Sequence, residues 1–138
     1  PVNETFKNVL DRLEIFSRKL LDSRNIKLHV EIPDYIKSLK LNIEQRKNLY
    51  LILREAIHNV AKYSQSTNCH ISAYEKVKVI VIQLRDDGIG FNLEDIKPGL
   101  GGNGLVNMQQ RAEEINARFN IESDTGKGTL ITLQFQHP

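Results

Sequence analysis

The sequence predicts an α/β (α+β) two-layer sandwich, in which helices pack on one face of a mixed, mostly antiparallel β-sheet. Helical and strand-like hydrophobic periodicities follow one another in the order α-β-α-β-β-loop-α-β-β. Two pairs of strands have no helix between their members, which favours hairpins over crossover connections. The chain has 138 residues, 40% of them hydrophobic, and we expect a single domain over 1–138.

The first half of the chain is predicted to contain two long helices with a strand between them. Apolar residues recur at three- and four-residue steps over 4–22, within an N-terminal helical segment (1–24) for which Asn3 is a candidate N-cap. Residues 26–32 alternate between apolar and polar, which indicates a half-buried strand. Asn42 begins a capping-box pattern that opens a second helix, over about 43–63.

The second half is predicted to contain two hairpins on either side of a glycine-rich loop and a helix. The expected strands are 68–75, 77–85, 118–123 and 128–136. The first hairpin is expected to turn at Glu75-Lys76 and the second at Asp124-Thr125-Gly126. The loop runs from Gly88 to Gly104 and leads into a helix over 105–117.

The composition excludes several classes of protein. A net charge of +2 without any Lys/Arg block argues against nucleic-acid binding. The single cysteine, Cys69, rules out an internal disulfide framework, fits a reducing compartment and is expected to be a packing residue. No stretch of ~20 apolar residues and no signal peptide is present, so we expect no direct membrane contact. Because the chain begins at Pro1 rather than Met, we expect it to be part of a longer protein.

A first candidate site follows the strand-like run that ends near residue 85. There the sequence reads Asp86-Asp87-Gly88-Ile89-Gly90. The Asp86 carboxylate can accept a hydrogen bond from an exocyclic amine, and Gly88 and Gly90 would allow the backbone to approach a flat ligand. Asp87 is expected to be a solvated neighbour. Taken alone, an Asp-Gly pair after a strand is also typical of an ordinary turn.

A second candidate site lies on the helix over 43–63. Steps of four and three residues place Glu55, Asn59 and Lys62 on one helical face. The amide oxygen of Asn59 is a suitable ligand for Mg²⁺, and Lys62 can reach phosphates as a point charge. By itself the spacing is equally typical of a solvent-exposed helix face.

The glycine-rich loop matches G-x-G-x-x-G over residues 99–104 but lacks the surroundings of a dinucleotide-binding fold. It follows Ile96-Lys97-Pro98 rather than a strand, and no βαβ unit encloses it. No Walker A sequence is present. The loop does open a helix, and a glycine-rich helix N-terminus can bind an anion.

Taken together, these segments resemble the GHKL ATPase superfamily, whose fold is the Bergerat fold. The four motifs that carry the resemblance are Glu55-x-x-x-Asn59-x-x-Lys62-Tyr63, Asp86-x-Gly88-x-Gly90-Phe91, Gly102-x-Gly104-Leu105 and Gly126-x-Gly128-Thr129. The chain is most similar to the ATP-binding catalytic domain of bacterial two-component sensor histidine kinases. Within these, Arg54-Glu55-Ala56 and the run 107–112 resemble the nitrate-sensor/desaturase-sensor branch.

The resemblance implies a role for each motif residue at the base and metal. Asp86 would accept from the adenine amine, and Thr129 would hold the same ring edge, directly or through water. Asn59 would bind the Mg²⁺ that bridges the phosphates, Lys62 would contact phosphate, and Tyr63 would lie against the base or ribose.

The resemblance also implies a phosphate-binding lid over 91–103. The box formed by Gly102, Gly104 and Leu105 would bind ATP, and the backbone amides of the two glycines would donate hydrogen bonds to phosphate. Glu55 would either activate a water molecule or order the water shell of the metal.

The expected function is therefore that of a protein-histidine kinase catalytic domain using ATP and Mg²⁺. It would transfer the γ-phosphoryl group to a histidine on a separate dimerisation domain of a dimeric parent, with a response regulator downstream. A cytoplasmic location is expected, whether or not the parent is anchored in the inner membrane. The chain's own histidines are expected to be poor acceptors: His29, His58, His70 and His137.

Two alternatives remain open on these motifs. An anti-sigma-type serine-protein kinase would use the same boxes and also lacks its own acceptor. An ATP-gated conformational module, like a chaperone or gyrase clamp, is less favoured, because 138 residues leave no room for a transducer domain.

Overall fold

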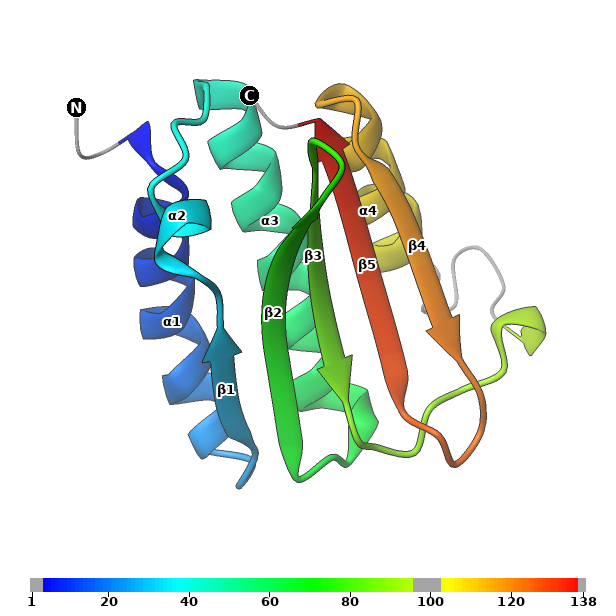
Figure 1. Cartoon of the computed structure of the whole chain (residues 1–138). Coiled ribbons are helices and arrows are strands. Elements are labelled where there is room, and N and C mark those ends of the chain that lie inside the picture. Colours follow the sequence, from blue (N-terminus) through cyan, green and yellow to red (C-terminus); the bar gives the residue numbers. More distant parts are fainter. Residues whose placement is uncertain (1–3, 96–102, 137–138) are drawn as a thin grey trace.

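The computed structural model describes residues 4–95 and 103–136, and over these residues it confirms the predicted two-layer fold (Figure 1). The sheet has the strand order β1-β2-β3-β5-β4, in which β1 and β2 are parallel and all other neighbours are antiparallel. Its strands are β1 (Lys27–Glu31), β2 (Asn68–Lys76), β3 (Val79–Asp86), β4 (Arg118–Ser123) and β5 (Thr129–Gln136).

The helices cover one face of this sheet, with α3 and α4 behind it in the view of Figure 1. Helix α3 packs between α1 and α4 and contacts both. The helical elements are α1 (Phe6–Asp22), α2 (Asp34–Lys37), α3 (Ile43–Asn59) and α4 (Asn103–Glu114), with a π-helical turn η2 (Val60–Ser64) and a 3-10 turn η3 (Leu93–Asp95).

The start of α3 confirms the predicted capping box. The Asn42 side chain accepts from the Gln45 amide at 2.8 Å, and the Gln45 side chain accepts from the Asn42 amide at 2.9 Å. Two of the donors that a helix N-terminus leaves unpaired are thereby satisfied. Helix α1 instead has Thr5 at its N-cap position, and the predicted cap Asn3 lies outside the described residues.

The core forms where alternate residues of the central strands face the helices. In β3 these residues are Ile80, Ile82 and Leu84, each at most 2% exposed. Their partners in β5 are Phe135, Leu133 and Ile131. Full burial of such a side chain stabilises the fold by roughly 1.5–3 kcal/mol, so the period-two pattern of the sequence fixes which face is buried. On the same face of β3, Asp86 follows Leu84 at the end of the strand.

Several predicted boundaries were wrong. The β2–β3 hairpin turns at Val77–Lys78, whose φ angles are 48° and 63°, rather than at Glu75-Lys76. Two successive left-handed residues are typical of a tight hairpin turn. That turn normally carries Asn or Gly, so Val77-Lys78 contains no sequence signal for it. The short helix α2 was not predicted, and α4 begins at Asn103 and ends at Glu114 rather than spanning 105–117.

Candidate functional site

Two of the predicted residues, Asp86 and Thr129, meet where β3 ends and β5 begins. They are direct cross-strand partners. The Asp86 carboxylate is only 4% exposed and accepts from the Gly88 amide at 2.9 Å. Burial raises its pKa above the ordinary carboxylate value, although hydrogen bonds from the Gly88 and Thr129 amides oppose the rise. A buried carboxylate with remaining lone pairs is suited to accept from a ligand donor.

Asp87 is exposed, as predicted, but its carboxylate also joins two strands. Its Oδ1 accepts from the amides of Thr67 and Asn68 at 2.8 and 2.9 Å, and its Oδ2 accepts from Asn68 Nδ2 at 2.9 Å. Desolvation raises the pKa of Asp87, but the hydrogen bonds from Asn68 and Thr67 together hold it below the ordinary value. Asn68 Oδ1 in turn lies 2.9 Å from His29 Nε2 on β1. Asp87 therefore ties the end of β3 to the start of β2.

The structure gives Gly88 and Gly90 a role that the sequence did not suggest. A Cβ atom on Gly88 would collide with the backbone of Ser64, and one on Gly90, where φ is +62°, would collide with the backbone of Asp124. The Ile89 amide also donates to the Ser64 carbonyl at 2.8 Å. These glycines thus allow the chain's own backbone segments to cross closely, and a role in approaching a ligand stays a prediction.

Ser123, which was not predicted, connects three parts of this region. Its Oγ lies 2.9 Å from the Phe91 amide, 2.9 Å from the Gly128 carbonyl and 2.9 Å from Thr129 Oγ1. Gly128 has φ +73°, and a Cβ there would collide with the Asp86 carbonyl. The only sequence signal for Ser123 was its place at the end of a strand just before the last glycine motif.

A second group of predicted residues meets between α3 and α4. Glu55 and Asn59 are one helical turn apart on α3, and Gly104 is in the first turn of α4. A Cβ atom on Gly104 would collide with Glu55 Oε1 and lie 3.6 Å from Asn59 Nδ2. Both polar side chains are half-buried, and neither has a hydrogen-bond partner within residues 4–95 and 103–136. Their polar atoms are therefore free to bind a ligand.

Lys62 and Tyr63 are carried by a π-helical turn rather than by α-helix. The prediction that Lys62 shares a face with Asn59 assumed α-helical steps, whereas η2 has the wider i→i+5 pattern. Ser64 Oγ donates to the Val60 carbonyl at 2.6 Å, and Gln65 ends the turn with φ +53°. The Lys62 ammonium lies 5.3 Å from the centroid of the Tyr63 ring. π-turns within helices are frequent at functional sites.

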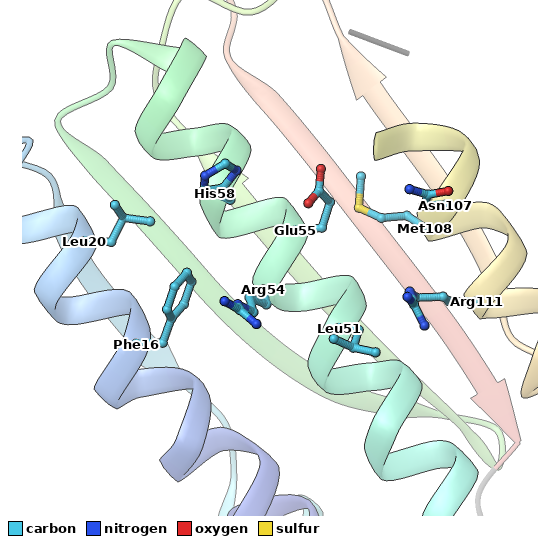
Figure 2. Close-up of a pocket in the computed structure, with 9 residues that line it drawn as sticks. All are labelled: Phe16, Leu20, Leu51, Arg54, Glu55, His58, Asn107, Met108 and Arg111. Carbon is cyan, nitrogen blue, oxygen red and sulfur yellow. The ribbon is translucent and has the colours of Figure 1, made fainter. Parts of the chain in front are cut away.

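A groove of about 500 Å³ runs along the outer side of the helices next to this second group (Figure 2). Figure 2 shows Glu55 between the ribbon of α3 and Asn107 and Met108 of α4. On the α1 side, the Arg54 guanidinium lies 4.7 Å from the Phe16 ring centroid. The residues that line the groove are Phe16, Leu20, Leu51, Arg54, Glu55, His58, Asn107, Met108 and Arg111.

The remaining predicted site residues have mixed outcomes. Gly102 and most of the predicted lid lie outside the described residues, and Leu105 is partly buried against the core. Cys69 is fully buried, and burial, followed by the charges of Asp86 and Asp87, raises its pKa to about 12, which fits a packing residue.

The described part of the chain contains no group of three His, Cys, Asp or Glu side chains that could hold a metal. No helix among the described residues is long and apolar enough to cross a membrane.

Comparison with known proteins places this geometry in context. The model of a family described as histidine kinase-, DNA gyrase B-, and HSP90-like ATPase matches residues 44–138. The oxygen sensor histidine kinase NreB of Staphylococcus carnosus is 31% identical over 80% of this chain and 32% of its own length. The sensor histidine kinase YdfH of Bacillus subtilis is 34% identical over 72% of this chain and 25% of its own length. The chain thus spans a third or less of these relatives.

The fold is shared with a solved structure described as the catalytic domain of histidine kinase ThkA. The two superpose with a TM-score of 0.77 over 96% of this chain and 94% of that chain, at 11% sequence identity.

Proposed function

Because the chain belongs to the family of histidine kinase-, DNA gyrase B- and HSP90-like ATPases, we propose that it is the ATP-binding catalytic domain of a sensor histidine kinase. The observation that carries the proposal is the buried Asp86 carboxylate, paired with Thr129 at the end of the sheet. Curated relatives that are sensor histidine kinases favour this function over an anti-sigma-type kinase or a clamp-like ATPase.

In this proposal the nucleotide lies between the two groups of site residues. The adenine amine donates to Asp86, with Thr129 at the same ring edge and Tyr63 against the base or ribose. The phosphates lie toward Glu55 and Asn59, where the start of α4 can give backbone amides to them.

A Mg²⁺ ion held by Asn59 and the phosphates would neutralise charge that develops on the γ-phosphoryl group. Lys62 is exposed and can turn from the Tyr63 ring toward a phosphate. The half-buried Glu55 either orders water around the metal or takes up a proton.

The phosphoryl acceptor is proposed to come from another domain, the histidine-bearing dimerisation domain of a dimeric parent, with a response regulator as the next acceptor. His29 and His70 stack on each other at 4.3 Å, and by strand alternation from the buried Cys69 they lie on the sheet face away from the helices. His58 is exposed on α3 and faces the groove (Figure 2). Because phosphoryl transfer depends mainly on positioning, an acceptor docked by another domain is required.

Calorimetric titration with ADP, with and without Mg²⁺, tests the nucleotide site. Asp86→Asn loses a charge-assisted hydrogen bond of ~1.5–3 kcal/mol, so we expect its affinity to fall by roughly one to two decades. Asp34→Asn, at a remote helix start, serves as the matched control and is expected to bind like the wild type. Wild-type affinity in Asp86→Asn would contradict the proposed site.

Incubation with γ-labelled ATP and Mg²⁺ tests the kinase class. We expect this chain to bind ATP, to turn it over slowly and to remain unlabelled. Stable, stoichiometric label on one of its histidines would overturn the need for a separate acceptor domain, and rapid phosphate release would instead favour a clamp-type ATPase.

A further inference from the structure

The hydroxyl group of Ser123 has three neighbours whose hydrogen-bonding roles are fixed by their chemistry. The Phe91 amide, 2.9 Å away, can only donate, and the Gly128 carbonyl, also 2.9 Å away, can only accept. The Ser123 hydroxyl therefore donates its single proton to the Gly128 carbonyl. Its third neighbour is the Thr129 hydroxyl, at 2.9 Å.

This arrangement leaves one role for Thr129 in the pair. With no proton left on Ser123 Oγ, the Thr129 hydroxyl must donate its own proton to Ser123. Its two lone pairs then remain, so toward a ligand or a water molecule Thr129 Oγ1 can only accept.

The groups next to Thr129 in the site are likewise hydrogen-bond acceptors toward a ligand. The Asp86 carboxylate, the cross-strand partner of Thr129, accepts whenever it is ionised. The Gly88 amide donates to that carboxylate and is not available to a ligand. This edge of the site thus offers acceptors from both strands.

We propose that Ser123 determines base specificity by holding the Thr129 hydroxyl as an acceptor, so that the site selects a purine with an amine at position 6 over one with a carbonyl there. The inference rests on the proposed nucleotide site. A carbonyl at position 6 has no proton to donate to Asp86 or Thr129, and the proton on N1 can pair with only one of them. At least one acceptor of the site would therefore be left without a donor, a situation that binding sites reject strongly. Ser123 touches no ligand in this scheme and acts through Thr129.

Competition between ADP and IDP provides the test, because the two nucleotides differ only in the amine or carbonyl at position 6 and the proton on N1. The quantity to measure is the ratio of their dissociation constants in calorimetric titrations with Mg²⁺. We expect the wild type to prefer ADP and Ser123→Ala to lower that preference by roughly tenfold, since the freed Thr129 hydroxyl can turn and donate to the carbonyl. Ser123→Thr, which keeps a hydroxyl, is expected to retain the wild-type ratio, as is the control Ser72→Ala in the middle of β2.

A double-mutant cycle with Thr129→Val shows whether Ser123 acts through Thr129. In the Thr129→Val background, Ser123→Ala should leave the ratio unchanged, because the hydroxyl that it would release is absent. Ser123→Cys, whose thiol is a weak donor in nearly the same space, replaces Ser123→Ala if circular dichroism shows that the alanine variant does not fold.

The outcomes separate this inference from the proposed function. Equal weakening of ADP and IDP in Ser123→Ala, or a ratio change that persists in the Thr129→Val background, would overturn the role of Ser123 alone. Failure of the wild type to bind ADP would overturn the nucleotide site itself.

Discussion

The two ends of the proposed nucleotide site are built in opposite ways. At the base end, Asp86, Asp87 and Ser123 each have hydrogen-bond partners on neighbouring strands or loops, at 2.8–2.9 Å. At the phosphate end, the polar atoms of Glu55 and Asn59 have no hydrogen-bond partner in the part of the chain that the structure describes. The base end is thus part of the folded framework, whereas the phosphate end holds polar groups that are unpaired among the described residues and can pair with a ligand.

This difference between the two ends shows where the same residues serve both folding stability and nucleotide binding. A satisfied hydrogen-bond network contributes to folding whether or not nucleotide is present. Free polar groups at a half-buried surface contribute little to folding and are available for recognition. We therefore expect substitutions at the base end to lower both stability and affinity, and substitutions at the phosphate end to lower affinity alone.

The largest expected effect is that of Gly128→Ala at the base end. A Cβ there would collide with the Asp86 carbonyl, and the backbone has φ +73°. We expect the free energy of unfolding to fall by about 3 kcal/mol or more, from left-handed strain and forced displacement together. Chemical denaturation measures this change.

Gly126→Ala is the matched control for that substitution. Its φ is +84°, but a Cβ would have no atom within 4 Å, so only the strain of about 1–2 kcal/mol is expected. Equal losses in the two variants would show that the close approach to Asp86 contributes nothing.

Asp87→Ala should have the next largest effect, because it removes three hydrogen bonds to a carboxylate. We expect a loss of about 1.5–3 kcal/mol at pH 7, reduced by exposure of the group to solvent. Asp87→Asn can keep the two backbone hydrogen bonds through its Oδ1, so it should lose less.

The pH dependence of that loss has a definite sign. The folded-state pKa of Asp87 lies below its unfolded value, so its stabilisation is complete above the unfolded pKa of roughly 3.9 and disappears as the pH falls through the folded pKa. Unfolding curves of wild type and Asp87→Ala should therefore converge in acid. A constant difference down to pH 2–3 (roughly one unit or more below that pKa) would contradict this assignment.

Hydrogen exchange should show the contrast directly when a nonhydrolysable ATP analogue and Mg²⁺ are added. The Gly88 and Ile89 amides already have protein acceptors, so their exchange should change little. Amides near Gly104, and across 92–103 as predicted from the sequence, should slow more, because phosphate supplies a new acceptor. A larger slowing of exchange at Gly88 and Ile89 than near Gly104 would contradict the contrast between the two ends of the site.

The smallest expected effect on stability is that of Asn59→Ala at the phosphate end. Alanine is the better helix former, so the free energy of unfolding should rise by about 0.5 kcal/mol or less. The same variant should lose the Mg²⁺-dependent part of its ADP affinity, while Asn120→Ala on β4 should keep it. A destabilised Asn59→Ala would mean that Asn59 is structural.

Much of the fold was predictable because its signals are local. The capping box at Asn42 is a short-range hydrogen-bonding pattern, and the alternation in β3 follows from the two-residue period of a strand. The order of the motifs also located Glu55, Asn59, Asp86 and Thr129, which the structure brings together in two groups. These features depend on residues close in sequence or on a pattern of spacing.

Only the tertiary structure decided how the site is held together. Ser123 contacts Phe91, Asp87 contacts Thr67 and Asn68, and Gly88 crosses Ser64, all between residues about twenty or more positions apart. Such contacts arise when packing brings distant backbone segments within hydrogen-bond distance, and no local propensity or period encodes them. The same packing placed Lys62 on a π-turn and turned the β2–β3 hairpin at Val77–Lys78. Local patterns therefore determined which elements form, while the crossing of those elements decided which side chains and glycines the site depends on.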